Sequence, residues 1–421
     1  MIKKGEEALE KFSTTAYPKA INQVAKGIYH VTGYGHSNAI VIEGERSLIL
    51  IDTLDSNERA KKMMTAMRKY TDKPVKTIIF THGHPDHRGG SGAFKETVTE
   101  IIAFSNKQPV LKHTALLADV FEVRGKRQFG YALNDEEALL QGIGIREGKA
   151  VNDGKYDFLA PTEVLTADQT ERVIDGIHLT LVAAPGETGD TGFIWLKEQG
   201  ILCCGDNYYG CWPNLSAIRG GQYRDVAEWV DSLDKIMSYD AEIVLPGHTK
   251  ALIGKAQVTE VLGNFRNAIN EVLLQTLQGM NEGKAVDEVV ACVQLPAHLQ
   301  HLPYLGEYYG TIEWTVKAIY YAYLGWYDGN PTNLHRLNSK AYAHKMLALI
   351  GSKEKVYQEI EQALASGTYQ WALELSDLLI QVEDKKGDLS KIAALRKQAP
   401  LETSANSRHY YLAYANDLEK N

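Results

Sequence analysis

The spacing of hydrophobic positions changes near residue 255. Before it, short apolar runs alternate with glycine-containing turns, as in residues 27–53 (GIYHVTGYGHSNAIVIEGERSLILIDT), a pattern typical of successive β-strands. Residues 223–239 lie between such runs and are amphipathic, with apolar residues at i, i+3, i+4 and i+7: Val226, Trp229, Val230 and Leu233. Interleaved strands and helices predict an α/β domain over residues 1–255, with sheets covered by helices.

After residue 255 the pattern is helical almost throughout. Residues 255–283 and 311–329 are long periodic runs, and shorter helices of tetratricopeptide-like length follow from residue 337 without a strict repeat. No low-complexity linker separates the two parts. We therefore predict a second, all-α domain over residues 256–421 that packs tightly on the first.

Several predicted strands end at a polar residue that could do chemistry. They are residues 75–82 (VKTIIFTH), 178–187 (HLTLVAAPGE), 201–207 (ILCCGDN) and 243–249 (IVLPGHT). The first leads into a dense cluster, Thr81–Gly90 (THGHPDHRGG). His82 and His84 are two positions apart at a strand end and point the same way, and Asp86 and His87 follow as the chain turns.

Imidazole and carboxylate groups at this spacing suit two adjacent zinc-like ions. One ion would be held by the His82–His84 pair and the other by Asp86 with His87. The alternative is a polar loop with chance histidines, but three buried imidazoles beside a carboxylate would be costly without a metal.

Composition and charge restrict the remaining possibilities. The 421 residues allow two or three domains, and a net charge of −8 argues against nucleic acid as a partner. Four cysteines are too few for a disulfide scaffold, so we expect small buried side chains. There is no apolar run of transmembrane length and no signal peptide as the chain stands. We expect a cytoplasmic protein, or a periplasmic one if a leader has been removed.

The pattern T-H-x-H-x-D-H-x-G-G resembles the signature of the metallo-β-lactamase superfamily. The resemblance covers residues 20–255 and implies an αββα sandwich. It also implies further metal ligands at later strand ends: Glu187, where many members carry histidine, Asp206 as a bridging carboxylate, and His248.

Glu187 within P-G-E narrows the resemblance to the alkylsulfatase branch, the type III sulfatases. Residues 204–225 (CGDNYYGCWPNLSAIRGGQYRD) resemble a segment of that branch, and residues 306–311 (GEYYGT) and 323–337 (YLGWYDGNPTNLHRL) resemble its helical dimerization domain. The resemblance extends to about residue 415. Members often carry a further sterol-carrier-like domain, which we do not expect in this chain.

The resemblance implies a dinuclear hydrolase that cleaves alkyl sulfate esters to alcohol and sulfate with a metal-activated water. The first Zn²⁺ would be held by His82, His84 and Glu187, the second by Asp86, His87 and His248, with Asp206 between them; manganese or iron would also fit these ligands. Arg219 and Asn214 are candidates to hold the sulfate group. For Arg224, which precedes Asp225 at a helix start, we expect a surface position. A homodimer is expected from the helical domain.

Two departures from the branch leave the substrate open. A histidine expected soon after Tyr-Gly-Thr is replaced by Glu313 and Trp314, and an expected tyrosine corresponds to either Phe129 or Tyr131. Side chains around Trp314 and Trp326 either form a wall for an alkyl chain or are ordinary core. We expect Asp52 to support the metal ligands and His36 to be structural. Hydrolysis of a phosphoester, lactone or thioester, and a non-catalytic metal-binding role, are the alternatives.

Overall fold

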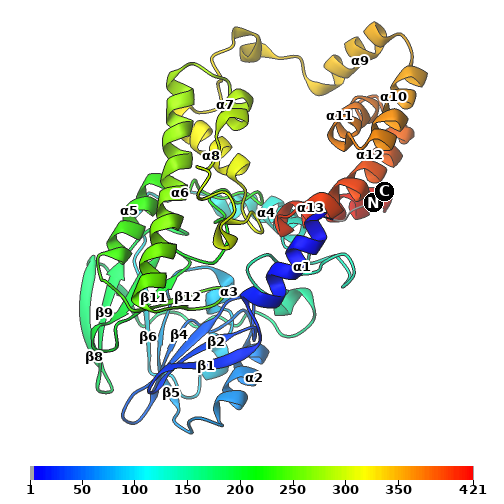
Figure 1. The fold of residues 1–421 in the computed structure, drawn as a ribbon. Helices are drawn as coiled ribbons and strands as arrows, with labels where there is room; N and C mark the ends of the chain where they lie inside the picture. The colour runs from blue at the N-terminus through cyan, green and yellow to red at the C-terminus, as the bar shows by residue number, and fades with distance from the viewer. Residues whose placement is uncertain (1–3, 421) are drawn as a thin grey trace.

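The computed structural model describes residues 4–420 and contains two stacked β-sheets (Figure 1). In the first sheet the strands follow chain order. Successive strands from β1 to β4 pair antiparallel, and those from β4 to β7 pair parallel. Its strands are β1 (Ala20–Ala25), β2 (Ile28–Thr32), β3 (Ala39–Glu43), β4 (Leu48–Ile51), β5 (Val75–Ile79), β6 (Glu100–Phe104) and β7 (Glu163–Leu165).

The second sheet has the strand order β13-β12-β11-β10-β9-β8. Only β11 and β12 are parallel to each other. Its strands are β8 (Gln169–Ile174), β9 (Ile177–Ala183), β10 (Gly192–Leu196), β11 (Ile201–Gly205), β12 (Ile243–Pro246) and β13 (Leu252–Ile253). These strands include the apolar runs that the sequence predicts.

The alternation of side chains along β4 shows why the sheets stack. Ile49 and Ile51 face the core between the two sheets, whereas Leu48 and Leu50 face the core under helix α2 (Asn57–Met67). A strand with both faces buried is apolar without interruption. On the far side, helices α5 (Val226–Met237) and α6 (Lys255–Asn281) cover the second sheet. The predicted αββα arrangement is confirmed.

The chain beyond β13 is helical, as predicted. Helix α6 packs on α5 within one hydrophobic core that crosses residue 255, so the boundary at that residue stays a prediction. Figure 1 shows the last helices standing apart from α6–α8 and returning at α13 to helix α4 and to α1. The other helices are α1 (Lys4–Ala16), α3 (Pro85–Arg88), α4 (Ala118–Gln128), α7 (Val286–Cys292), α8 (Ile312–Leu324), α9 (Ser339–Ile350), α10 (Lys353–Ser366), α11 (Tyr369–Ile380), α12 (Lys385–Gln398) and α13 (Ala405–Glu419).

The fold also shows where the four cysteines lie and whether a helix could span a membrane. Cys203, Cys204 and Cys211 are buried as expected, but Cys292 is exposed because it ends the short helix α7 at the surface. Across residues 4–420, every helix is too short or too polar to cross a bilayer.

Candidate metal centre

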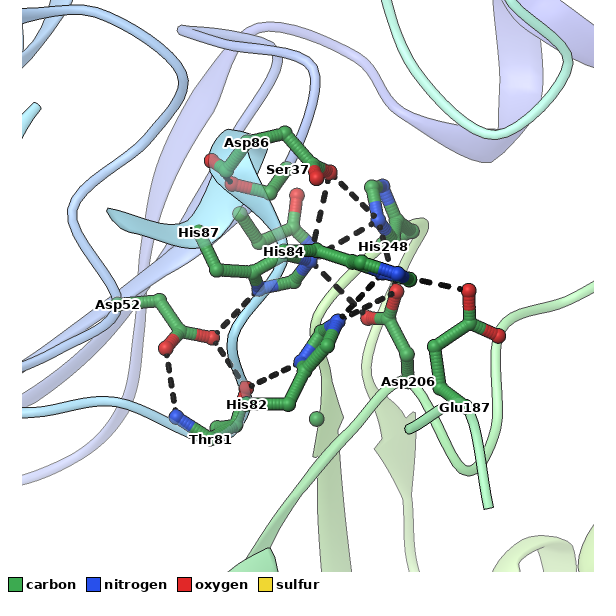
Figure 2. Close-up of polar contacts among 12 residues, drawn as sticks. Ser37, Asp52, Thr81, His82, His84, Asp86, His87, Glu187, Asp206 and His248 are labelled. Carbon is green, nitrogen blue, oxygen red and sulfur yellow. Dashed lines mark hydrogen bonds and ion pairs between the residues drawn. The ribbon is translucent and has the colours of Figure 1, made fainter. Parts of the chain in front are cut away.

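The strand ends bring all seven proposed metal ligands to one edge of the stacked sheets. His82 and His84 follow β5, Glu187 follows β9, Asp206 follows β11 and His248 follows β12. The short helix α3 adds the remaining two, Asp86 and His87. Figure 2 shows the imidazoles and carboxylates pointing toward one another. Apart from Asp86 and His84, which are partly exposed, these side chains are buried.

Asp206 lies at the middle of this group. Its carboxylate oxygens are 3.2 Å from His248 Nε2, 3.4 Å from His87 Nε2 and 3.8 Å from His82 Nε2. On one side His84 Nδ1 is 3.4 Å from Glu187 Oε1, and on the other an Asp86 oxygen is 3.3 Å from His248 Nε2. Asp206 is thus placed where a bridging carboxylate would be needed.

The outer nitrogens of two imidazoles are held by fixed partners. Asp52 Oδ2 lies 2.7 Å from His87 Nδ1 and accepts a hydrogen bond from Thr81 Oγ1, also at 2.7 Å. His248 Nδ1 is 3.0 Å from the main-chain oxygen of His36. Such contacts orient a ring so that its other nitrogen faces a metal. The structure places Asp52 in the supporting position expected from the sequence.

Carboxylates dominate the electrostatics of the centre. Burial disfavours charged imidazole, yet Asp206 and Asp86 outweigh it and raise the pKa of His248 to about 9. Burial also opposes ionisation of Asp206, but His248, His87 and His82 hold its pKa well below the usual range. The centre therefore has a negative field that favours bound cations.

The donor atoms fit metal ions. Glu187 Oε2 and Asp206 Oδ1 are buried without a hydrogen-bond partner, although such atoms are nearly always paired. Nitrogen atoms of His82 and His84 face each other at 3.0 Å, a distance at which two lone pairs would repel unless a proton or a metal intervened. Donor atoms within 4.8 Å of one another form three groups: His82–His87–Asp206, His84–Glu187–Asp206 and His36–Asp86–His248.

These groups divide the ligands differently from the sequence-based assignment and add His36. The His36 ring also has a structural contact, since its Nδ1 is 3.0 Å from the main-chain oxygen of Ile145. The division of ligands between two ions stays a prediction.

Arg224 is buried, which corrects the surface position expected for it. Asp225 caps α5 as expected by accepting hydrogen bonds from Ala227 N and Glu228 N, but Arg224 turns inward. Its Nη1 is 2.7 Å from Glu187 Oε1 and also donates to the main-chain oxygen of Asn214. The guanidinium of Arg224 is thus paired with Glu187, the carboxylate on which the resemblance to the alkylsulfatase branch depends.

A cavity of about 250 Å³, here called the apolar cavity, opens over the metal centre. Five of the proposed metal ligands line it: His84, Asp86, Glu187, Asp206 and His248. Both candidates for the expected tyrosine line it, and the other apolar and aromatic lining residues include Phe121, Ile143, Tyr156 and Tyr309.

Of the two alternatives for the side chains around Trp314 and Trp326, a wall for the alkyl chain does not apply to this cavity, because neither residue lines it. Trp314 faces a different groove together with Glu313, and Trp326 is 71% exposed. The aromatic wall comes instead mainly from α4 and the segment after it, with Tyr309 as the contribution of the helical part. Sequence spacing cannot show which helices face the strand ends.

The two substrate-binding candidates have different positions. Arg219 lines the apolar cavity, and its guanidinium lies 5.9 Å from the Phe129 ring centre and donates to the main-chain oxygen of Gly220. Asn214 is buried beside Arg224 and does not line the cavity. Its side-chain oxygen has no hydrogen-bond partner. A contact between Asn214 and substrate stays a prediction.

Glu147 is a cavity residue that the sequence did not indicate. Its Oε2 accepts hydrogen bonds from the hydroxyl groups of Tyr131, at 2.8 Å, and Tyr156. Burial, followed by the charges of Asp86 and Asp55, raises its pKa to about 7, although both tyrosine hydrogen bonds oppose the rise. No local motif marks it; only the fold brings these three residues together.

This raised pKa predicts a pH-dependent stability. The folded pKa of Glu147 lies above its ordinary value of 4.5, so the folded protein binds the proton more tightly and loses stability as pH rises toward 7. We expect Glu147→Gln to remove this loss. In metal-free protein, the stability of the variant relative to wild type should increase between pH 5 and pH 8 by at most about 3 kcal/mol. Denaturant unfolding at both pH values measures it, and Glu122→Gln on exposed α4 is the control. Parallel pH profiles for Glu147→Gln and wild type would contradict the expectation.

Two family models match this chain, one on each part. The metallo-β-lactamase superfamily model matches residues 32–248, and the alkyl sulfatase dimerisation model matches residues 285–421. The chain therefore belongs to the metallo-β-lactamase superfamily, in its alkylsulfatase branch.

Individual relatives support that placement. A linear primary-alkylsulfatase from Pseudomonas sp. is 34% identical over 390 residues, which is 90% of this chain and 73% of the relative. An alkyl/aryl-sulfatase from Saccharomyces cerevisiae is 29% identical over 412 residues, 94% of this chain and 64% of that protein. The sec-alkylsulfatase Pisa1 from Pseudomonas sp. shares the fold with a TM-score of 0.86 at 24% identity, over 95% of this chain and 65% of that one. The chain spans about two thirds of the length of these relatives.

Proposed function

We propose that this protein is a dinuclear metal-dependent hydrolase that cleaves alkyl sulfate esters to an alcohol and inorganic sulfate. The observation that carries the proposal is the position of Arg219. Its guanidinium lies at the cavity beside the metal centre, and no ion pair joins it to a carboxylate within residues 4–420. A sulfate group would supply the missing anion, since guanidinium binds two oxygens of an oxyanion at once.

We assign His82, His84 and Glu187 to one ion, Asp86, His87 and His248 to the other, and Asp206 to both. Zinc suits this mixture of imidazole and carboxylate. When bound, two such ions supply an acidified water and neutralise charge that develops on the ester.

The chain's own groups would orient the substrate. Arg219 would hold the sulfate oxygens, and Asn214 is a further candidate donor. The aromatic wall formed by Phe121, Phe129 and Tyr309 would receive the alkyl chain and exclude water from it. Arg224 would hold the Glu187 carboxylate in place through its 2.7 Å contact.

Metal content and substrate screening test the proposal together. Protein isolated without chelator is expected to contain close to two transition-metal ions per chain, because seven donor side chains converge on one centre. Elemental analysis measures the ions. A panel of alkyl sulfate, phosphate, lactone and thioester substrates is then assayed before and after chelation. One ion or none in metal-replete protein would contradict the assignment, and metal-dependent turnover of another ester alone would redirect the proposal.

Hydrolysis of another ester is kept as a second candidate because of one observation. Glu313 and Trp314 stand where the branch has a histidine, and both lie outside the apolar cavity, with Glu313 paired to Lys317. That position therefore supplies no group to a leaving alcohol in this chain. A non-catalytic metal-binding role is less well supported, because a cavity opens directly onto the seven donors.

We also propose a homodimer formed through the helical part. Apolar side chains at the end of α8 and in the segment that leads to α9 have exposed fractions of 46% to 71%: Tyr321, Tyr323, Leu324, Trp326, Leu334 and Leu337. Such a cluster is typical of a protein interface. Light scattering at micromolar concentration should give a dimer mass, and Trp326→Asp should shift it toward monomer. Val173→Asp, at the exposed edge strand β8, should leave the dimer intact. A wild-type monomer, or equal effects of both variants, would contradict this interface.

A further inference from the structure

A second cavity lies against the metal centre and shares a wall with the apolar cavity. It also has a volume of about 250 Å³, and His84, Glu187 and Arg219 line both. The remaining residues are different. We call it the polar cavity, lined in addition by Asn106, Gln108, Thr188, Gly189, Ala217, Gly221, Gln222, Tyr223 and Arg224.

The two linings differ in apolar content and in the balance of charge. Around the apolar cavity there are aromatic and aliphatic groups from α4, the segment after it and Tyr309. Its charged lining residues are mostly acidic: Asp86, Glu122, Glu147, Glu187 and Asp206, against Lys126, Lys149 and Arg219. Around the polar cavity there are amide and hydroxyl side chains, one tyrosine and two guanidinium groups. A hydrocarbon chain is stabilised by the aromatic groups of the first cavity. In the second cavity the cationic groups outnumber the carboxylate, and this balance favours a small anion.

The charges of the polar cavity favour an anion. Arg219 and Arg224 both line it, and its only carboxylate, Glu187, is already paired with Arg224 at 2.7 Å. Two acids stand behind the lining, and each has a partner: Glu228 accepts from Gln108 Nε2 at 2.6 Å, and Asp190 accepts from Thr188 Oγ1. Burial and then the charge of Arg224 lower the pKa of Arg219, so an anion between the two would relieve their repulsion.

The cavity also has a route to solvent. Asn106, Gly221 and Gln222 are exposed, whereas Arg224 at the other end is buried. Gln222 fastens this rim by donating from Nε2 to the Pro109 main-chain oxygen and accepting from Leu111 N at 3.3 Å.

We propose that the polar cavity is the exit for the inorganic sulfate product, while the alcohol leaves through the apolar cavity. The inference rests on the proposed alkylsulfatase function. Arg219, which lines both cavities, would keep hold of the sulfate as it passes from the metal centre to Arg224 and then to the rim. With separate exits, the charged sulfate does not cross the apolar cavity and the apolar alcohol does not cross the polar cavity.

Charge changes at Gln222 test the exit. Gln222→Lys should strengthen inhibition of ester hydrolysis by sulfate, and Gln222→Glu should weaken it, each by about threefold to tenfold at low ionic strength and less at high salt. Gln222→Met controls for loss of the rim hydrogen bonds. Glu122→Gln raises the net charge by one, as Gln222→Lys does, but at the apolar cavity. It should leave sulfate inhibition nearly unchanged.

Inhibition by the alcohol product tests the apolar cavity in the same way. Phe121→Ala should weaken inhibition by a long-chain alcohol without changing that by sulfate, whereas the Gln222 variants should leave alcohol inhibition unchanged. Equal sulfate inhibition in Gln222→Lys and Gln222→Glu, or an equal response to Glu122→Gln, would overturn the exit.

Calorimetry of sulfate binding to zinc-loaded protein separates this inference from the proposed function. If the wild type hydrolyses no alkyl sulfate, the proposed function is wrong. A sulfate affinity that rises in Gln222→Lys and falls in Gln222→Glu would still show that the polar cavity binds anions. Absence of such binding would overturn the cavity as well.

Discussion

Glu187→Ala is expected to remove one of the two metal ions and to lower alkyl sulfate turnover by more than about 100-fold. Loss of a group that only supports a ligand costs roughly 10- to 100-fold in metal affinity or activity, and a ligand itself should cost more. Without the carboxylate, His82 and His84 would remain as the protein ligands specific to that ion. Elemental analysis and ester turnover, measured on the same preparation, check the result.

The Arg224 contact requires a control for folding. Removing Glu187 leaves a buried guanidinium without its 2.7 Å partner, and such a change can cost about 3–5 kcal/mol of stability. The double variant Glu187→Ala/Arg224→Met removes both charges and should recover stability but not the ion. Glu187→His should keep the ion, because imidazole is an equally good zinc donor, while hydrolysis falls. Two ions and full activity in Glu187→Ala would show that Glu187 is not a ligand.

The positions of the candidate ligands at strand ends could be found from the sequence because they depend on local structure, whereas the metal-binding role of Glu187, Asp206 and His248 is implied by the resemblance to the family. A buried strand followed by a polar residue defines the positions of His82, Asp206 and His248, and stacking of the strands then brings them to one edge. The fold class follows from the same alternation of apolar runs. These features need no knowledge of how distant helices pack.

The errors concern side chains whose surroundings come from distant segments. Arg224 precedes a helix start, where a surface position is expected, but its side chain is buried and pairs with Glu187, which follows a distant strand. For Trp314 and Trp326 the sequence leaves a cavity wall and ordinary core as alternatives, and the cavity is instead lined by α4 and the segment after it. Glu147 lines the cavity beside Tyr131 and Tyr156, which both donate hydrogen bonds to it, and no local pattern places these three residues together. Side-chain spacing along the chain contains none of this information.

Arg219→Ala is expected to lower kcat/KM for alkyl sulfates by roughly 30- to 1,000-fold, the equivalent of about 2–4 kcal/mol for a charged hydrogen bond in a site closed to water. Metal content should stay the same, because Arg219 contacts none of the proposed ligands closely enough to form an ion pair. The fold should also tolerate the change, since the side-chain hydrogen bond of Arg219 goes to the adjacent Gly220 main chain and no buried carboxylate loses its partner.

Arg124→Ala is the matched control, because it removes the same charge from the exposed face of α4 and a similar hydrogen bond, to the Ile218 main-chain oxygen. Arg219→Lys distinguishes shape from charge. Lysine keeps the positive charge but cannot bind two sulfate oxygens in one plane, so it should recover part of the loss and no more. Full recovery by lysine would show that Arg219 contributes only its positive charge and not its two-point contact with the sulfate oxygens. Unchanged kinetics in Arg219→Ala would remove it from the substrate site and, with it, the main support for a sulfate ester as the substrate.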